Sequence, residues 1–334
     1  MTDVRRRLVA AVAAFGALAA AAVLAAPLAG STPIRLDRVF DRSVPFADNV
    51  DAQIFFIARL PRALAGALVG ASLAAAGVVF QALLRNPLAT PFTLGVSAGS
   101  ALGAMLAITL RLHLSLWGVS AVTAASFAGA VCAVAIVYGM ARARHSGFST
   151  NVLLLAGVTL NAFFSALILF VQYVADSAEA LRTVRWLMGD LDVAGYRPIL
   201  AALPLCALSF AAFAWLPRAL NLLSLDADAA ASRGIDVLRA QRVAFFSASM
   251  ATGAAVSLGG PIGFIGIIVP HLVRLIVGAD HRVTLPASAL FGAAFLVGAD
   301  VAARTVMAPV ELPVGIITAL VGGPFFLWLL VRAR

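Results

Sequence analysis

The chain has 334 residues, of which 62% are hydrophobic and 12% charged, with a formal net charge of +9 and a mean hydropathy of +1.01. Soluble domains carry about 25% charged and 45–50% apolar residues, so this composition excludes a soluble enzyme, a disordered tail and a large domain on a single anchor. Because one transmembrane helix takes about 20 residues, roughly ten helices would account for the apolar fraction. The long uninterrupted apolar runs also argue against an outer-membrane barrel, whose strands alternate apolar and polar residues.

All 24 basic residues are arginines. Without lysine the chain cannot carry a Walker A phosphate loop or a Schiff-base lysine. Cys132 and Cys206 form no CxxC pattern, and the histidines have no metal-ligand spacing. We therefore expect no cofactor, no metal site and no ATP hydrolysis by this chain alone.

Ten nearly charge-free runs are long enough, or nearly so, to cross a bilayer as helices, which satisfy their own backbone hydrogen bonds in lipid. They lie at 8–28, 59–84, 92–110, 116–140, 151–174, 198–216, 240–258, 262–278, 284–303 and 313–331. We predict an all-α membrane protein with about ten transmembrane helices in a single domain, residues 1–334. The first run follows Arg5-Arg6-Arg7 and resembles a signal peptide, but its length favours a retained helix.

The region 243–273 is ambiguous, since it fits one span with a re-entrant piece or two spans hinged at Gly259-Gly260-Pro261. Cytoplasmic loops collect positive charge. Two spans place 14 arginines inside and 10 outside, whereas one span leaves 11 inside and 13 outside. We therefore predict two spans here, with both termini cytoplasmic. The whole net charge of +9 then lies on the inner face.

The longest inner connection, 217–239, lies between the sixth and seventh spans. Leu220, Leu223 and Ala227 share a helical face, and Asp226 or Asp228 could cap a second short helix that ends at Gly234. The pattern fits two short amphipathic helices that dock into a groove on a partner. It fits equally a surface loop lying along the lipid headgroups.

Few polar residues interrupt the runs. Asp300 precedes Arg304 by four residues, which is the spacing of an ion pair within one helix. We prefer that interpretation to a proton relay, because an ion-coupled carrier would typically show an acidic residue at mid-span.

Several segments now support a resemblance to a known family. Arg59-Leu-Pro-Arg62 is followed by GASLAAAGVVFQALLRNPLATPFTLGVSAGSALGA (70–104), LLLAGVTLNAFFSAL (153–167), RWLMGDL (185–191), LNLLSLDADAAASRGI (220–235), GPIGFIGIIVPHLVR (260–274) and ELPVGIITALVGGPFFLWLL (311–330). In this order they resemble the FecCD, or type II, permeases of ABC importers for iron-siderophores, haem and cobalamin. The resemblance covers about residues 55–331.

The resemblance implies a bacterial inner-membrane homodimer with two cytoplasmic ATPase subunits below it and a periplasmic binding protein above it. Cargo would cross by alternating access driven by the ATPase. Nothing in the chain indicates nucleic-acid binding. The family's coupling helices match the segment 217–239, and the implied ATPase contacts are Leu220, Leu222, Leu223, Leu225, Asp226, Ala229, Arg233 and Gly234.

Arg59, Arg62 and Arg304 match positions where similar permeases present basic residues to acidic ones on the binding protein. The charge-based topology places all three on the outer face. Such contacts would supply steering and register. The alternative is that they are interfacial arginines whose side chains reach lipid headgroups.

The cargo is only weakly indicated by the residues. The stretch Thr90-Pro91-Phe92-Thr93 and RWLMGDLD resemble siderophore or haem permeases more than cobalamin permeases. We therefore expect an iron chelate, with cobalamin as the alternative within the family. From a different class, an ion-coupled secondary transporter remains the competing hypothesis.

Overall fold

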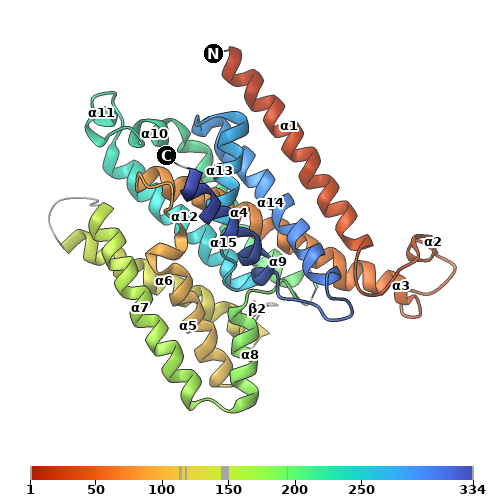
Figure 1. Ribbon diagram of the computed structural model, residues 1–334. Coiled ribbons are helices and arrows are strands. Elements are labelled where there is room, and N and C mark those ends of the chain that lie inside the picture. The colour runs from red at the N-terminus through yellow and green to blue at the C-terminus, as the bar shows by residue number, and fades with distance from the viewer. Residues whose placement is uncertain (1, 113–114, 117–118, 144–149, 194, 333–334) are drawn as a thin grey trace.

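The fold is a bundle of long helices, seen in a computed structural model that describes residues 2–112, 115–116, 119–143, 150–193 and 195–332 (Figure 1). Each of the ten apolar runs coincides with one helix of the bundle. These helices are α1 (Thr2–Ala25), α4 (Leu60–Leu83), α5 (Val96–Thr109), α6 (Ala121–Ala143), α7 (Thr150–Val174), α9 (Arg197–Trp215), α12 (Val237–Gly259), α13 (Ile265–Val277), α14 (His281–Thr305) and α15 (Val314–Arg332).

Shorter elements fill the connections. They are η1 (Ala26–Leu28), α2 (Leu36–Val39), α3 (Val50–Gln53), the π-helical η2 (Ile54–Arg59), η3 (Pro91–Leu94), β1 (Ser115–Leu116), β2 (Val119–Ser120), α8 (Ser177–Leu187), α10 (Pro217–Leu223) and α11 (Ala227–Ala231). The two strands pair antiparallel, with Ser115 opposite Ser120. This hairpin occupies the start of the run predicted as a span at 116–140, so the fourth helix begins later than expected.

Six helices in the described part of the chain are long and apolar enough to cross a membrane, and shorter apolar helices accompany them. The expected spans at 92–110 and 262–278 are the shortest, because left-handed residues interrupt them. Gly95 has φ +81° between η3 and α5, and Phe264 has φ +69° immediately before α13. The hinge at Gly260, with φ +68°, separates α12 from α13. The region 243–273 therefore forms two helices, as predicted, while the exact number of crossings stays a prediction.

Helix α4 lies at the centre of the bundle and packs against α12, α13 and α14. In the segment Val50–Leu83, 78% of the most apolar window is buried. Glycines allow this close approach: Gly70 faces the backbone of Gly292 on α14, and Gly77 faces the backbone of Gly266 on α13. Lipid tails are as apolar as the side chains, so burial of apolar surface contributes little to helix association in a membrane. Small residues instead favour association because they let helix backbones pack closely.

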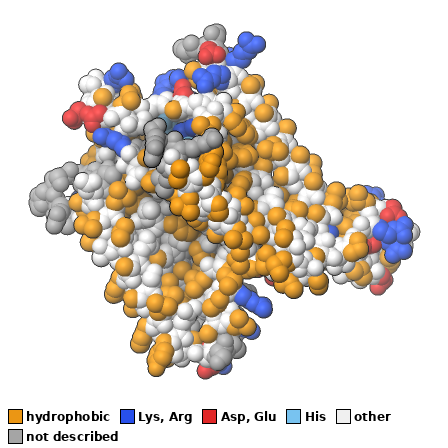
Figure 2. Space-filling view, in the orientation of Figure 1, with side chains coloured by type: hydrophobic (Ala, Val, Ile, Leu, Met, Phe, Trp, Pro, Cys, Tyr) orange, Lys and Arg blue, Asp and Glu red, His pale blue; other side chains and the backbone are white. Residues whose placement is uncertain are grey.

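The outer helices show the opposite pattern. Only 17% to 28% of the apolar windows of α1, α6, α7 and α9 is buried. Figure 2 shows hydrophobic side chains across the middle of the visible face, with charged side chains gathered toward the ends. This distribution is typical of a protein whose central part lies in the hydrocarbon core of a bilayer.

The two ends of the bundle match the faces assigned from arginine counts. The N-terminal end of α1 and the C-terminal end of α15 lie at the same end as α10 and α11 (Figure 1). Each ion pair between described residues joins two side chains assigned to the same face. For example, Arg85 binds Asp226 at the inner face, and Arg111 binds Asp176 at the outer face. The predicted inner connection at 141–150 lies mostly outside the described residues.

Candidate functional site

The outer end of α4 carries a buried arginine that joins three separate segments. The Arg62 guanidinium donates from Nε to Asp300 Oδ1 on α14 at 2.8 Å and from Nη1 to Glu311 Oε2 at 2.9 Å. Its Nη2 lies 3.6 Å from Asp190 Oδ1, in the connection after α8. Burial raises the pKa of the Asp190 carboxyl. The three contacts of Arg62 tie α4, α14 and two outer connections together.

Two further arginines complete this outer arginine cluster, defined here as Arg59, Arg62 and Arg304 with their acidic partners. Arg304 Nε lies 3.0 Å from Asp300 Oδ2, so the predicted pair within one helix is confirmed. Arg304 also donates to the carbonyl oxygens of Ala26 and Ala29. Arg59 donates to Pro27 and Thr32 oxygens. These bonds hold the connection that follows α1.

The structure therefore brings together all three residues predicted to dock a binding protein, but their side chains point inward. Arg59, Arg62 and Arg304 are each less than 9% exposed in the single chain. Their docking role stays a prediction, since their guanidinium groups already have partners within the chain. Their position favours a part in organising the outer surface rather than in direct contact.

Asp190 and Glu311 are members of the cluster that sequence reasoning missed. Both lie within the motifs quoted above, RWLMGDL and ELPVG, yet no local spacing links either residue to Arg62. Asp300 was visible because its partner is four residues away. The other pairings arise only when distant segments pack together.

The inner end carries the predicted coupling segment, folded as two short helices joined by a turn. α10 packs against α4, α9, α12 and α14, while α11 contacts α10 and α12. Asp226 precedes α11, but its side chain makes no cap bond to that helix. The Asp226 carboxylate instead binds Arg85 Nη1 at 3.1 Å. Gly234, with φ +79°, lies in the turn that follows α11.

The predicted ATPase contacts divide into an inward and an outward set. Leu220 and Leu223 are buried against the chain's own core, with Leu222 and Ala229 half-buried. Leu225 is 67% exposed. Asp226, Arg233 and Gly234 are also exposed. The amphipathic face identified from sequence is therefore the one that anchors the segment to the bundle, and the turn is the part free to meet a partner.

Sequence reasoning also missed the residue that fastens α10 to α14. Asn221 Nδ2 donates to Asp280 Oδ1 at 2.8 Å, and Asn221 Oδ1 accepts from the backbone N–H of His281 at 2.9 Å. Arg282 holds the pKa of the Asp280 carboxyl well below its usual range. Through α14, the inner coupling segment is thus connected to the outer arginine cluster.

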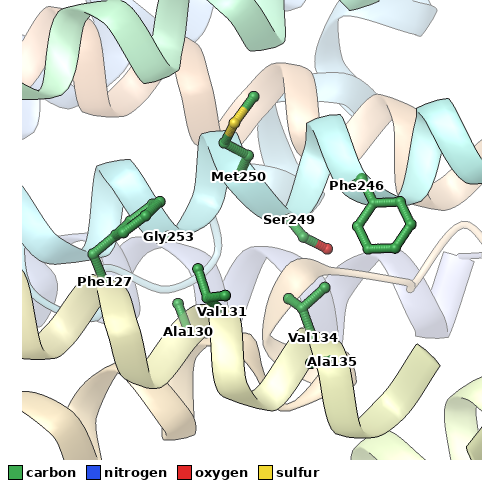
Figure 3. Close-up of a pocket in the computed structure, with 9 residues that line it drawn as sticks. All are labelled: Phe127, Ala130, Val131, Val134, Ala135, Phe246, Ser249, Met250 and Gly253. Atoms are coloured by element: carbon green, nitrogen blue, oxygen red, sulfur yellow. The ribbon is translucent and has the colours of Figure 1, made fainter. Parts of the chain in front are cut away.

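A groove of about 260 Å³ lies between α6 and α12 (Figure 3). Its lining is apolar except for the Ser249 hydroxyl, and it is formed by Phe127, Ala130, Val131, Val134, Ala135, Phe246, Ser249, Met250 and Gly253. Val131 and Phe246 are partly exposed on the outside of the bundle. The groove therefore has the character of a lipid-facing surface. The described residues contain no group of three or more His, Cys, Asp or Glu side chains that could hold a metal ion.

Comparison with known proteins decides the family. The model of the FecCD transport family matches residues 18–332. The chain belongs to the FecCD transport family. This match extends the resemblance seen in the quoted motifs to nearly the whole chain.

Three relatives illustrate the similarity. The cobalamin import permease BtuC of Halobacterium salinarum is 46% identical over 81% of this chain and 72% of its own length. The hemin permease HmuU of Yersinia pestis is 40% identical over 83% of this chain and 82% of its own. The uncharacterized ABC transporter permease YvrB of Bacillus subtilis is 40% identical over 88% and 83%.

A solved structure supports the same assignment. It is an inward-facing conformation of a transporter assigned to the metal-chelate type of ABC transporter, and it superposes with a TM-score of 0.82 at 33% identity. The match covers 96% of this chain and 98% of that one. The protein is therefore a permease subunit of an ABC transporter, a multi-pass protein of the inner membrane and a transport subunit rather than an enzyme.

Proposed function

We propose that this FecCD permease imports a metal chelate from the periplasm as a homodimer powered by two cytoplasmic ATPase subunits. The family match over residues 18–332, with relatives that are import or transport permeases, carries the proposal. A periplasmic binding protein would deliver the chelate to the outer face. The chain supplies the path, and the ATPase supplies the energy.

The inner face supports this division of labour. The turn between α10 and α11 presents Leu225, 67% exposed, beside the Arg85–Asp226 ion pair. An apolar side chain with adjacent charges suits a groove on a partner. Because Asn221 fastens α10 to α14, movement of the ATPase subunits would reach the transmembrane helices through a short rigid connection.

The outer face supports docking less directly. With Arg59, Arg62 and Arg304 buried in the single chain, we propose that they shape the outer surface, and that a binding protein engages them only if it displaces their internal partners. Asp190 and Glu311 compete with any carboxylate that such a partner presents.

The proposed cargo is an iron chelate, either haem or a ferric siderophore. Relatives named for hemin transport and for iron chelatin transport support this proposal. Cobalamin is the second candidate, because the Halobacterium salinarum relative named for cobalamin import is 46% identical to this chain. The three cargoes share a large, rigid metal-binding ring or chelate, which a wide apolar path would suit.

An ion-coupled carrier is the competing function from another class. Such a carrier needs an acidic side chain that is free to bind and release an ion. Asp300, the acid buried within a long helix, is held by Arg62 at 2.8 Å and by Arg304 at 3.0 Å. Its pairing favours a structural role.

The deciding experiment is ATP hydrolysis by the complex of this chain with its ATPase and binding protein, reconstituted in liposomes. Haem, a ferric siderophore and cobalamin are added in turn, and a complex without the binding protein is the control. We expect one chelate to stimulate hydrolysis only when the binding protein is present. Uptake driven by an ion gradient through this chain alone, without nucleotide, would refute the proposal.

A further inference from the structure

A basic cavity of about 720 Å³ opens at the inner end of the bundle, beside the coupling segment. Helices α1, α9, α10, α12 and α14 and the connection before α12 contribute to its wall. The lining includes Trp215, Arg218, Ala219, Asp236, Arg239 and Arg282. We call this cavity the inner basic groove. It is separate from the outer arginine cluster and does not include Leu225, but Gly234, one of the predicted ATPase contacts, is part of its lining.

Two arginines of the groove have positive charge that the chain does not neutralise. Arg218 and Arg239 form no ion pair with any residue that the structure describes. Arg282, in contrast, is bound to Asp280 at 2.6 Å. The Asp236 carboxylate accepts the backbone N–H of Arg239 at 2.9 Å and so caps α12. The groove therefore holds two exposed guanidinium groups that are available to bind an anion.

The exposed tryptophan at its edge favours a position for the groove at the level of the lipid headgroups. Trp215 is the last residue of α9 and is 55% exposed. Its ring has the Arg239 guanidinium carbon 5.7 Å from its centre. Tryptophan is enriched at membrane–water interfaces. One heptad earlier on the same face of α9, Leu208 is 61% exposed. Leu208 and Trp215 thus form an apolar stripe along the outside of α9 that ends at the groove.

We propose that the inner basic groove binds the phosphate headgroup of an anionic phospholipid of the inner leaflet. A phosphate diester accepts hydrogen bonds from guanidinium groups in a geometry that Arg matches well. Basic pockets between helices on the cytoplasmic side are suited to anionic headgroups. The apolar stripe on α9, ending at Trp215, receives the acyl chains, which distinguishes a lipid from a soluble phosphate.

The site has a consequence for the transporter because it includes both ends of the coupling segment. Arg218 and Ala219 belong to α10, and Asp236 follows the turn after α11. A bound headgroup would link these two ends to α9 and α12. Lipid occupancy would then steady the segment that carries the exposed turn.

The test is retention of phosphatidylglycerol by the purified full chain, measured by native mass spectrometry after exchange into micelles with equal phosphatidylglycerol and phosphatidylcholine. The wild-type chain should retain phosphatidylglycerol preferentially. The double variant Arg218→Gln with Arg239→Gln should bind it about 30-fold more weakly, because each positive charge removed near a membrane surface weakens binding about fivefold. The charge-retaining variant Arg218→Lys with Arg239→Lys should keep most of the binding.

The matched control removes two exposed arginines of the inner face outside the groove, Arg142→Gln with Arg242→Gln, and should bind like the wild type. Adding millimolar glycerol phosphate should not displace the lipid. Equal retention by the groove variant and the control, or displacement by glycerol phosphate, would overturn the proposal. So would loss of ATPase binding in the groove variant with lipid retention unchanged, which would identify the groove as a protein contact. Because lipid binding is measured on the permease alone, its failure is distinct from failure of the proposed import function.

Discussion

Asp300 is the residue on which the outer arginine cluster depends. It is 1% exposed and contacts both Arg62 and Arg304, each also buried. The two guanidinium groups would repel each other without it. A buried ion pair is costly to form, but removing one partner is costlier still, because the remaining charge stays in a medium of low dielectric constant.

We therefore expect Asp300→Asn to lower the free energy of unfolding by about 3–5 kcal/mol. The matched control is Glu311→Gln, which removes the other carboxylate bound to Arg62, but from a side chain that is 41% exposed. It should cost less than about 1 kcal/mol. Both values are measured by SDS titration of the purified chain in mixed micelles. Equal stabilities of the two variants would show that Asp300 is not the main compensating charge.

At the scale of elements, the sequence predicted helices well because lipid leaves the backbone few alternatives. Each apolar run became a helix. What it could not predict was where a run is interrupted. Phe264 adopts φ +69° just before α13, although nothing in its residue type favours a left-handed backbone. The surrounding packing imposes that conformation.

In the candidate sites, too, contacts within one helix were predictable from the sequence, whereas contacts between distant segments were not. The Asp300–Arg304 pair was predictable, since both residues lie on one helix four positions apart. The contact of Asn221 with Asp280 joins residues 59 positions apart, and Arg62 reaches Glu311 across 249 positions. Amphipathic spacing located α10 correctly but did not tell whether its apolar face meets a partner or the bundle. Burial of Leu220 and Leu223 decides that it meets the bundle.

The packing of α4 on α14 makes a prediction about glycines on one helix. A methyl group at Gly292 would lie 2.5 Å from Ala74 Cβ and from Gly70 O, whereas Gly298 has no atom within 4 Å of that position. Gly292→Ala should force the helices apart and cost about 1–3 kcal/mol. Gly298→Ala should leave stability unchanged or raise it by up to about 1 kcal/mol. SDS titration compares the two, and similar destabilisation of both would contradict close α4–α14 packing.

The coupling segment gives a second prediction at this scale. Leu225→Asp places a charge on the exposed turn, so the permease should still fold but lose co-purification of the ATPase subunit. Leu223→Asp buries a charge in the core and should instead reduce the yield of folded permease. Val44→Asp, at an exposed apolar position of the outer connection, is the control and should retain the ATPase. If the Leu225→Asp permease retains the ATPase as the control does, the turn is not the contact.

At the scale of the whole molecule, arginine asymmetry and internal contacts agree on which segments share a face. The inner face includes Arg85 with Asp226 and Arg282 with Asp280, and the outer face includes the arginine cluster. A single helix, α14, connects the two faces: Asp280, which binds Asn221, precedes its first residue, and Asp300 of the outer arginine cluster lies near its end. A transporter needs such a connection, because events at the ATPase and at the binding protein must influence each other through the same helices.

The number of crossings is the remaining question at this scale, and it depends on the hinge at Gly260. If α12 and α13 both cross the membrane, Ala279 lies in the cytoplasm and Val310 in the periplasm. If the pair makes a single crossing, the two positions exchange sides. Both residues are exposed in the structure, so a cysteine at either position would be accessible from its own side.

In a Cys132→Ala background, which removes the exposed native thiol, we expect Val310→Cys to react with a membrane-impermeant maleimide in intact cells. Ala279→Cys should react only after the inner membrane is opened. Ser43→Cys and Ser232→Cys serve as references for the outer and inner faces, because the two hinge topologies assign each of them to the same side. The reverse pattern at positions 279 and 310 would mean one crossing. It would contradict the contact between Asn221 and Asp280, because Asn221 lies on the inner face in both topologies whereas Asp280 would then lie on the outer face. Labelling of Val310→Cys but not Ala279→Cys in intact cells would establish an even number of crossings, which places the C-terminal end of α15 on the same side as α10 and α11.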